Sequence, residues 1–273
     1  MEILLLIFIG VVGGLIAGTL GLGGGVFYIL VLPYIIGWYG IPTEYISSFV
    51  VANSLLGIAF ASIASLVAQF SQIKRYFSEI FLLSVPAVII SLLITKFVVH
   101  SSWFSTELFN ILVVFIMIFI LVQMFFKNKN IQKESVGMKN QKIRPKEGIF
   151  SGSVAGLISA LSGLGGGIII IPILNLYLNQ DLHKTKTISL SVIFMSSLFI
   201  SIENFFSQPN YYSDSLNTVG FIIPAISTPL VLGVIIGGPL GIKLSSMMSE
   251  KHIKLLFVFF VLLVLIDKLI NLF

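Results

Sequence analysis

The chain has 273 residues, of which 57% are hydrophobic and only 10% are charged. Soluble domains carry about 25% charged residues, so this composition indicates an integral membrane protein. The absence of cysteine excludes disulfides, thiolate nucleophiles and cysteine-based metal or iron–sulfur sites. The net charge of +5 comes from basic residues gathered between apolar segments, which is typical of orientation in a membrane and not of nucleic-acid binding.

About eight apolar segments follow one another, and they predict an all-α polytopic membrane protein. They lie at 3–36, 44–70, 77–99, 104–126, 148–178, 185–206, 219–248 and 252–272. Several exceed the ~20 residues that a spanning helix needs. A polar connection between the fourth and fifth segments carries seven cations, Lys127, Lys129, Lys133, Lys139, Lys142, Arg144 and Lys146. We therefore expect a first transmembrane repeat over 1–127, a basic cytoplasmic linker over 128–147 and a second transmembrane repeat over 148–273.

The two halves share a glycine run. Gly21-Leu22-Gly23-Gly24-Gly25 returns 142 positions later as Gly163-Leu164-Gly165-Gly166-Gly167. The alignment continues without a gap from Gly10–Ser54 against Gly152–Ser196, and it includes the hydroxyl pairs Thr43/Thr185, Ser47/Ser189 and Ser54/Ser196. These matches at one offset indicate an internal duplication.

Each glycine run should interrupt its helix. A glycine costs ~1 kcal/mol relative to alanine in a helix, so three in succession should leave backbone N–H and C=O groups unpaired. Inside a bilayer such groups persist only where protein or a water-filled cavity satisfies them. Broken helices at matching places in two halves point to a transport site. The alternative is that these glycines only allow helices to pack closely.

The first segment of each half is too long for one simple span. Residues 3–36 would form a helix of about 51 Å, against a hydrocarbon core of ~30 Å. It is therefore either a broken spanning helix or a re-entrant hairpin that turns at the glycines. With a hairpin in each half, fourteen cations share one side of the membrane and two lie opposite, whereas eight spans give ten against six. Because cytoplasmic loops accumulate Lys and Arg, we expect hairpins, inverted repeats, both termini outside and the linker in the cytoplasm.

We expect an anion-binding site at the two glycine breaks. Free N–H groups and the positive end of a helix dipole would bind an anion there without a cationic side chain, and almost no Lys or Arg lies deep in an apolar segment. For any single Ser or Thr, the alternative role is a bond within its own helix or packing between helices. We place Asn53/Ser54 and Ser196/Ser197 at equivalent depth on the helix that follows each hairpin. The expected substrate-binding residues are Thr19, Gly21, Gly23, Gly24, Gly25, Asn53, Ser54, Ser162, Gly163, Gly165, Gly166, Gly167, Ser196 and Ser197.

Acidic residues inside membranes are costly and mark functional positions. Glu203 lies near the end of its apolar segment, so both a proton-coupling role and simple placement at the interface stay open. Neither glycine run is followed by the Lys-Ser/Thr of a nucleotide-binding loop, and no His-Glu-x-x-His motif or catalytic dyad occurs. We therefore expect neither an ATP-driven pump nor an enzyme, and no metal or cofactor.

The two stretches Gly14-Leu15-Ile16-Ala17-Gly18 through Gly25, and Gly156-Leu157-Ile158-Ser159-Ala160 through Gly167, resemble the repeated motif of the TauE/SafE sulfite-exporter permeases. The resemblance covers essentially the whole chain. It implies a multi-pass secondary transporter of small sulfur-containing anions, such as sulfite or organosulfonates, in the plasma (inner) membrane of a bacterium.

Two other classes of function stay open, namely a carrier of a different small anion or a cation, and a membrane scaffold with no transported ligand. A scaffold gives no reason to break two helices at equivalent depth. The expected partners are the small anionic substrate and the lipid bilayer, with no nucleic acid. A coupling ion (proton or sodium) and a homodimer are left open.

Overall fold

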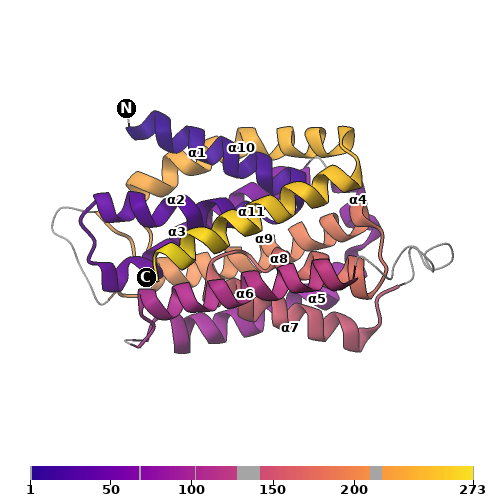
Figure 1. The fold of residues 1–273 in the computed structure, drawn as a ribbon, viewed down its shortest axis with the longest axis horizontal. Coiled ribbons are helices and arrows are strands. Elements are labelled where there is room, and N and C mark those ends of the chain that lie inside the picture. The colour runs from indigo at the N-terminus through magenta and orange to yellow at the C-terminus, as the bar shows by residue number, and fades with distance from the viewer. Residues whose placement is uncertain (1, 68, 102, 128–141, 210–216, 273) are drawn as a thin grey trace.

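A computed structural model of the chain describes residues 2–67, 69–101, 103–127, 142–209 and 217–272 (Figure 1). The described part of the chain is helical apart from loops and one isolated bridge between Val219 and Ile222. The α-helices are α1 (Glu2–Leu20), α2 (Gly25–Trp38), α3 (Thr43–Val67), α4 (Phe70–Arg75), α5 (Phe77–Ile94), α6 (Thr106–Lys127), α7 (Pro145–Ser162), α8 (Gly167–Pro172), α9 (Leu182–Phe206), α10 (Pro224–Met247) and α11 (Glu250–Ile270). Two π-helical turns, η1 (Thr95–Val99) and η3 (Ile173–Tyr177), continue α5 and α8.

Six stretches of the described residues are long and apolar enough to cross a membrane. They are Glu2–Leu20, Thr43–Val67, Phe77–Val99, Thr106–Gln123, Leu182–Phe206 and Pro224–Met247, and α2 is a shorter apolar helix. The prediction of an all-α polytopic membrane protein is confirmed.

Local sequence signals set the starts of several helices. Pro145 opens α7, and the Glu147 carboxylate accepts the N–H of Arg144 at 3.2 Å. Asp181 caps α9, because its carboxylate accepts the N–H groups of the next residues, at 2.9 Å from His183 and 3.2 Å from Lys184.

Helix directions distinguish the hairpin from the broken spanning helix. Helices α1, α3 and α10 run in the same direction. As residue numbers rise along one of these helices, the numbers of the residues that it contacts in the neighbouring helix also rise. The pairs that show this are Gly10–Leu230 and Gly18–Gly238 between α1 and α10, and Gly57–Leu230 and Ala64–Gly238 between α3 and α10. Consecutive spans α1 and α3 can be parallel only if α2 returns to the side where α1 began. The first segment is therefore a re-entrant hairpin.

Contacts between the two arms agree with this geometry. A Cβ added to Gly24, at the start of α2, would lie 2.5 Å from the carbonyl oxygen of Gly13 in α1. At the other end of the hairpin, Trp38 and Tyr39 share a small surface pocket with Glu2 and Leu5. In the second half, a Cβ added to Gly166 would likewise lie 2.5 Å from the carbonyl oxygen of Ala155 in α7.

The two halves interlock through their hairpins. Helix α1 of the first half packs along α10 of the second, and α7 of the second half packs along α5 of the first. These contacts are backbone to backbone, since small residues recur every fourth position and let the helices approach closely. Added Cβ atoms would overlap facing carbonyl groups at Gly10, Gly18, Gly152, Gly156, Gly233, Gly237 and Gly241. Helices α3 and α9 lie against one another between these pairs.

Figure 1 shows both chain ends at one end of the bundle, while α6 ends and α7 begins at the opposite end. The hairpin α1–α2 thus enters from the side of the termini, and the hairpin beginning with α7 enters from the other side. Inverted repeats with discontinuous helices are a common transporter plan. The residues 128–141 of the expected linker lie outside the described part of the chain.

We predict that the end of the bundle holding the termini faces outward. The chain has no cysteine, so single thiols placed at Lys146 and at Asn271 give a clean labelling test. An impermeant maleimide added to intact cells should label Asn271→Cys and leave Lys146→Cys unmodified until the cells are opened. The reverse pattern would contradict the orientation derived from the loop charges.

Candidate functional site

Each glycine break is a tight turn made of left-handed backbone. Gly21, Gly23 and Gly24 have φ of +76°, +72° and +79°, and Gly163, Gly165 and Gly166 have +64°, +83° and +70°. L-residues with a Cβ rarely adopt this conformation, so the repeated glycine pattern follows from the repeated turn. The first glycine of each run ends a helix, with the N–H of Gly21 bonded to the carbonyl of Ala17 and that of Gly163 to the carbonyl of Ser159.

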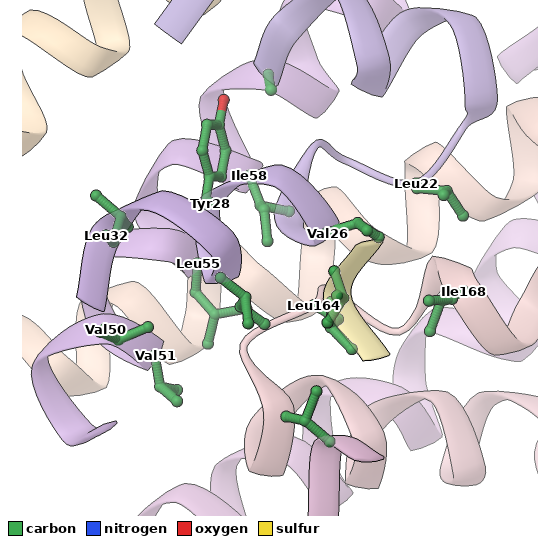
Figure 2. Close-up of a cluster of buried hydrophobic side chains, with 14 of the residues drawn as sticks. Leu22, Val26, Tyr28, Leu32, Val50, Val51, Leu55, Ile58, Leu164 and Ile168 are labelled. Carbon is green, nitrogen blue, oxygen red and sulfur yellow. The ribbon is translucent and has the colours of Figure 1, made fainter. Parts of the chain in front are cut away.

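The two turns meet in the middle of the bundle. A Cβ added to Gly25 would lie 2.6 Å from the carbonyl oxygen of Leu164, and one added to Gly167 would lie 3.1 Å from that of Gly21. Ile58 of α3 and Ile193 of α9 contact both turns. These two residues lie close to the centres of their helices, which span Thr43–Val67 and Leu182–Phe206. Figure 2 shows the side chains of Leu22, Val26, Leu164 and Ile168 gathered around this crossing.

Two serines fasten the crossing reciprocally. The hydroxyl of Ser54 in α3 donates to the carbonyl oxygen of Gly163 at 2.8 Å, and that of Ser189 in α9 donates to the carbonyl oxygen of Gly21 at 2.9 Å. Each serine therefore binds the glycine turn of the opposite half. Both hydroxyl groups satisfy carbonyl oxygens that the broken helices leave unpaired.

This pairing corrects the alignment drawn from the sequence. The gap-free alignment places Ser54 at the depth of Ser196, and that prediction is wrong because Ser189 is the structural counterpart of Ser54. Ser54 follows Gly21 by 33 positions, whereas Ser189 follows Gly163 by 26. The connection between the second turn and α9 is thus seven residues shorter than the one between the first turn and α3. Seven residues are about two turns of helix, so the same face of the helix points to the crossing in either alignment.

The turns leave a run of unpaired backbone N–H groups at the crossing. Within the described ranges, no hydrogen-bond acceptor is found for the N–H groups of Leu22, Gly23, Gly24, Gly25 and Val26, or of Gly165, Gly166, Gly167 and Ile168. Buried backbone groups are nearly always paired, so this run of unpaired N–H groups at two helix starts makes the crossing the candidate binding site. Their polarity suits an anion.

Three buried hydroxyl groups near the turns also lack partners among the described residues. They belong to Tyr28, Ser62 and Ser159. The hydroxyl oxygen of Ser62 lies 3.3 Å from the position of a Cβ added to Gly23, so it adjoins the unpaired N–H groups of the first turn. Ser62 is not among the predicted residues, because it lies beyond Ser54, where the gap-free alignment of the two halves ends.

Some predicted residues hold the structure around the crossing. Thr19 donates to the carbonyls of Leu15 and Gly241, and so fastens α1 to α10. The Ser162 hydroxyl donates to the Ile158 carbonyl at 2.5 Å and accepts the Leu164 N–H at 3.3 Å, which caps the second turn.

The remaining predicted residues lie away from the turns or bond within their own helix. Ser196 and Ser197 both donate to the carbonyl of Ile193 in α9. Glu203 lies half-buried near the end of α9, and its carboxylate is 3.4 Å from the hydroxyl of Ser207. A role of Glu203 in proton coupling stays a prediction.

On the side of the termini, a layer of packed aromatic rings is formed by Phe49, Phe221 and His100. Asn53 donates to the Phe221 carbonyl at 3.1 Å and accepts the Ile223 N–H at 2.9 Å. Phe221 stacks on His100, with ring centroids 4.5 Å apart, and His100 is hydrogen bonded to Asn204 at 2.9 Å. Burial lowers the pKa of His100 from its ordinary 6.5, while Asn204 and the charge of Glu203 act in the opposite direction.

On the opposite side, an ion pair closes the bundle. Lys184 of α9 lies 2.8 Å from the Glu79 carboxylate of α5, and the same carboxylate accepts the N–H of Ile143 at 3.1 Å. Lys184 also donates to Gln180 at 2.8 Å. These bonds hold the starts of α5 and α9 together.

Two cations at the start of an apolar segment are buried in the bundle, which the sequence does not predict. Lys184 and Lys186, in the first turns of α9, are each only 3% exposed. Periodicity could not show this, because a lysine near the start of a predicted helix usually extends to the membrane surface. Lys186 is covered by the first glycine turn and by Ser245 of α10, whereas Lys184 lies among Glu79, Gln180 and the ring of Tyr76.

Comparisons with known proteins agree with this architecture. The family model described as "Sulfite exporter TauE/SafE" matches residues 4–267. A probable membrane transporter protein of Methanocaldococcus jannaschii is 28% identical over 258 residues, covering 92% of this chain and 90% of that protein. The probable membrane transporter protein YunE of Bacillus subtilis is 23% identical over 270 residues, covering 94% and 93% of the two chains.

The reciprocal serine bonds lead to a paired prediction. Ser54→Ala and Ser189→Ala should each lower the free energy of unfolding by about 1–3 kcal/mol, because each leaves a buried carbonyl oxygen without its donor. Ser65→Ala is the matched control, since that hydroxyl donates only within its own helix, to Ala61 at 2.8 Å. Unfolding in detergent measures the stability of all three variants. Equal stability of Ser54→Ala and Ser65→Ala would contradict a stabilising role for the hydrogen bond from Ser54 to Gly163.

Proposed function

The chain belongs to the sulfite exporter TauE/SafE family, and from that premise we propose that this membrane transporter carries small sulfur-containing anions such as sulfite or organosulfonates. It acts as a secondary permease, with no metal or organic cofactor. Its place is the plasma (inner) membrane of a bacterium. The substrate binds between the two glycine turns near the middle of the membrane.

One observation carries the proposal, namely the two runs of N–H groups without acceptors where the turns meet. The positive ends of two helix dipoles converge there from opposite sides of the bundle, and a sulfite or sulfonate group offers three oxygens as acceptors. Backbone donors suit an anion that must leave again, because neutral amides bind it less strongly than several fixed cations would. The unpaired hydroxyl of Ser62 adds one further donor beside Gly23.

The two closed layers suit alternating access. The aromatic layer of Phe221 and His100 lies on one side of the crossing, and the ion pair of Lys184 and Glu79 lies on the other. Opening one layer while the other stays closed would expose the turns to each side in succession, as in other inverted-repeat transporters. In this proposal Glu203, whose charge acts on nearby His100, couples the movement to a proton.

Two other functions are supported less well. A cation carrier would place carboxylates at the broken helices. Among the described residues the buried carboxylate is that of Glu79, which already pairs with Lys184. A scaffold would not need unpaired N–H groups in the middle of its core.

Transport in proteoliposomes tests the function directly. Vesicles containing the purified protein should take up sulfite or an organosulfonate saturably, and sulfate and chloride should compete weakly or not at all. Empty vesicles and vesicles with heat-denatured protein are the controls. Saturable uptake of a different anion would replace the substrate class, and uptake of no anion across a broad panel would favour the scaffold.

Ser62→Ala separates binding from folding. Its hydroxyl has no partner within the described residues, so its removal should leave the melting temperature unchanged or slightly raised. If the hydroxyl donates to the bound anion, affinity should fall by about 1.5–3 kcal/mol, as for a hydrogen bond to a charged group. Ser65→Ala serves again as the control. Ser65 lies three residues farther along α3, and its hydroxyl donates to Ala61 within the same helix. Unchanged affinity in Ser62→Ala would remove this serine from the site.

A further inference from the structure

Lys186 is a buried cation that lies directly against the first glycine turn. Its Cγ and Cβ are 3.0 and 3.1 Å from the position of a Cβ added to Gly21. The side chain is 3% exposed, and its ammonium group contacts the hydroxyl of Ser245 in α10. Within the described residues no carboxylate lies within ion-pair distance of Lys186.

In the other half of the molecule, an apolar residue takes the position that Lys186 takes here. The structural correspondence that pairs Ser54 with Ser189 also pairs Val51 with Lys186. The Cα of Val51 lies 3.1 Å from a Cβ added to Gly163, and the Cα of Lys186 lies 3.3 Å from one added to Gly21. The same position against the same turn is thus apolar in one half and cationic in the other.

A buried ammonium group with one neutral partner is energetically unfavourable. It has three N–H donors, and removal from water is offset only by a counter-charge or a full set of acceptors. Ser245 supplies one oxygen. An anion at the first turn would supply the missing charge, and the turn already presents the unpaired N–H groups of Leu22–Val26 and the unpaired hydroxyl of Ser62.

We propose that Lys186 is the counter-charge of the transported anion and makes the first glycine turn the tighter of two unequal half-sites. This inference rests on the proposed function and assigns it a side chain. The flexible four-carbon stem lies on Gly21, so rotation about its torsions moves the ammonium group between Ser245 and the turn. The second turn, beside Val51, binds the anion through backbone groups alone.

A different role would be purely structural. The ammonium group lies near the end of α10, which extends to Met247, and a cation there interacts favourably with the helix dipole. In that case Lys186 stabilises the fold and does not touch the anion. Removing the charge should weaken anion binding if Lys186 is the counter-charge, and should lower the stability of the fold if its role is structural.

Lys186→Met tests the proposal, because methionine keeps an unbranched stem on Gly21 and removes the charge. Sulfite binding to the purified protein, measured by calorimetry, should weaken by about 30-fold or more, while the melting temperature stays equal or rises. Lys186→Arg should keep most of the affinity. Lys243→Met, an exposed residue of α10 with the same change in net charge, should bind sulfite as the wild type does.

The outcomes separate the two levels of inference. Wild-type affinity in Lys186→Met, with or without lost stability, would overturn the role of Lys186 and leave the proposed function standing. If the wild-type protein binds neither sulfite nor an organosulfonate, the proposed function fails and this inference fails with it.

A thiol at the same position gives a second measurement that does not depend on Lys186→Met folding well. Because the chain has no cysteine, Lys186→Cys carries a unique reactive group. In membrane vesicles, aminoethyl methanethiosulfonate should restore an ammonium group and sulfite uptake, whereas the neutral methyl methanethiosulfonate should label the thiol without restoring uptake. No labelling by either reagent, or full labelling with no difference in uptake, would overturn the proposal.

Discussion

The close approach of two glycine turns at the centre of the bundle is the constraint on which the rest of the structure depends. No side chain fits between Gly25 and the carbonyl of Leu164, or between Gly24 and the carbonyl of Gly13. The turns therefore need both the left-handed backbone that glycine allows and the space that a missing Cβ leaves. Close packing and unpaired backbone N–H groups are two consequences of the same residues, so the packing and binding interpretations of the glycine runs are compatible.

The interlocked halves connect this centre to the ends of the molecule. Helix α1 packs on α10 through facing glycines, and in α7 the glycines Gly152 and Gly156 pack on the backbone of α5 at Leu83 and Ala87. Each hairpin is thereby bound to the third long helix of the other half, and each turn is held by a serine from the opposite half. A movement of α10 or α5 must displace a hairpin, and through it a glycine turn.

The two closing layers differ in chemistry although the repeats share one fold. Phe49 packs against Phe221 at a centroid distance of 5.6 Å on the side of the termini, and its structural counterpart, Lys184, pairs with Glu79 on the other side. Val51 and Lys186 show the same contrast one half-turn farther on. Separating the aromatic rings would expose apolar surface to water, which is unfavourable in proportion to its area. Separating the ion pair would replace the attraction between its two charges by their hydration.

The sequence by itself determined the membrane class, the positions of the apolar segments and the two glycine breaks, and its loop charges favoured a hairpin that the helix directions then established. Composition, segment length, the glycine penalty and the distribution of Lys and Arg are local or additive properties, and they need no knowledge of contacts. Only the tertiary structure decided that Ser54 corresponds to Ser189. The connection from the second glycine turn to α9 is seven residues shorter than its counterpart, and seven residues are about two helical turns, so the apolar pattern of the helix does not reveal the difference. It also decided that Lys186 is buried, since a lysine near a helix start extends to water unless a neighbouring element covers it, and here the tip of α1 and the end of α10 do so.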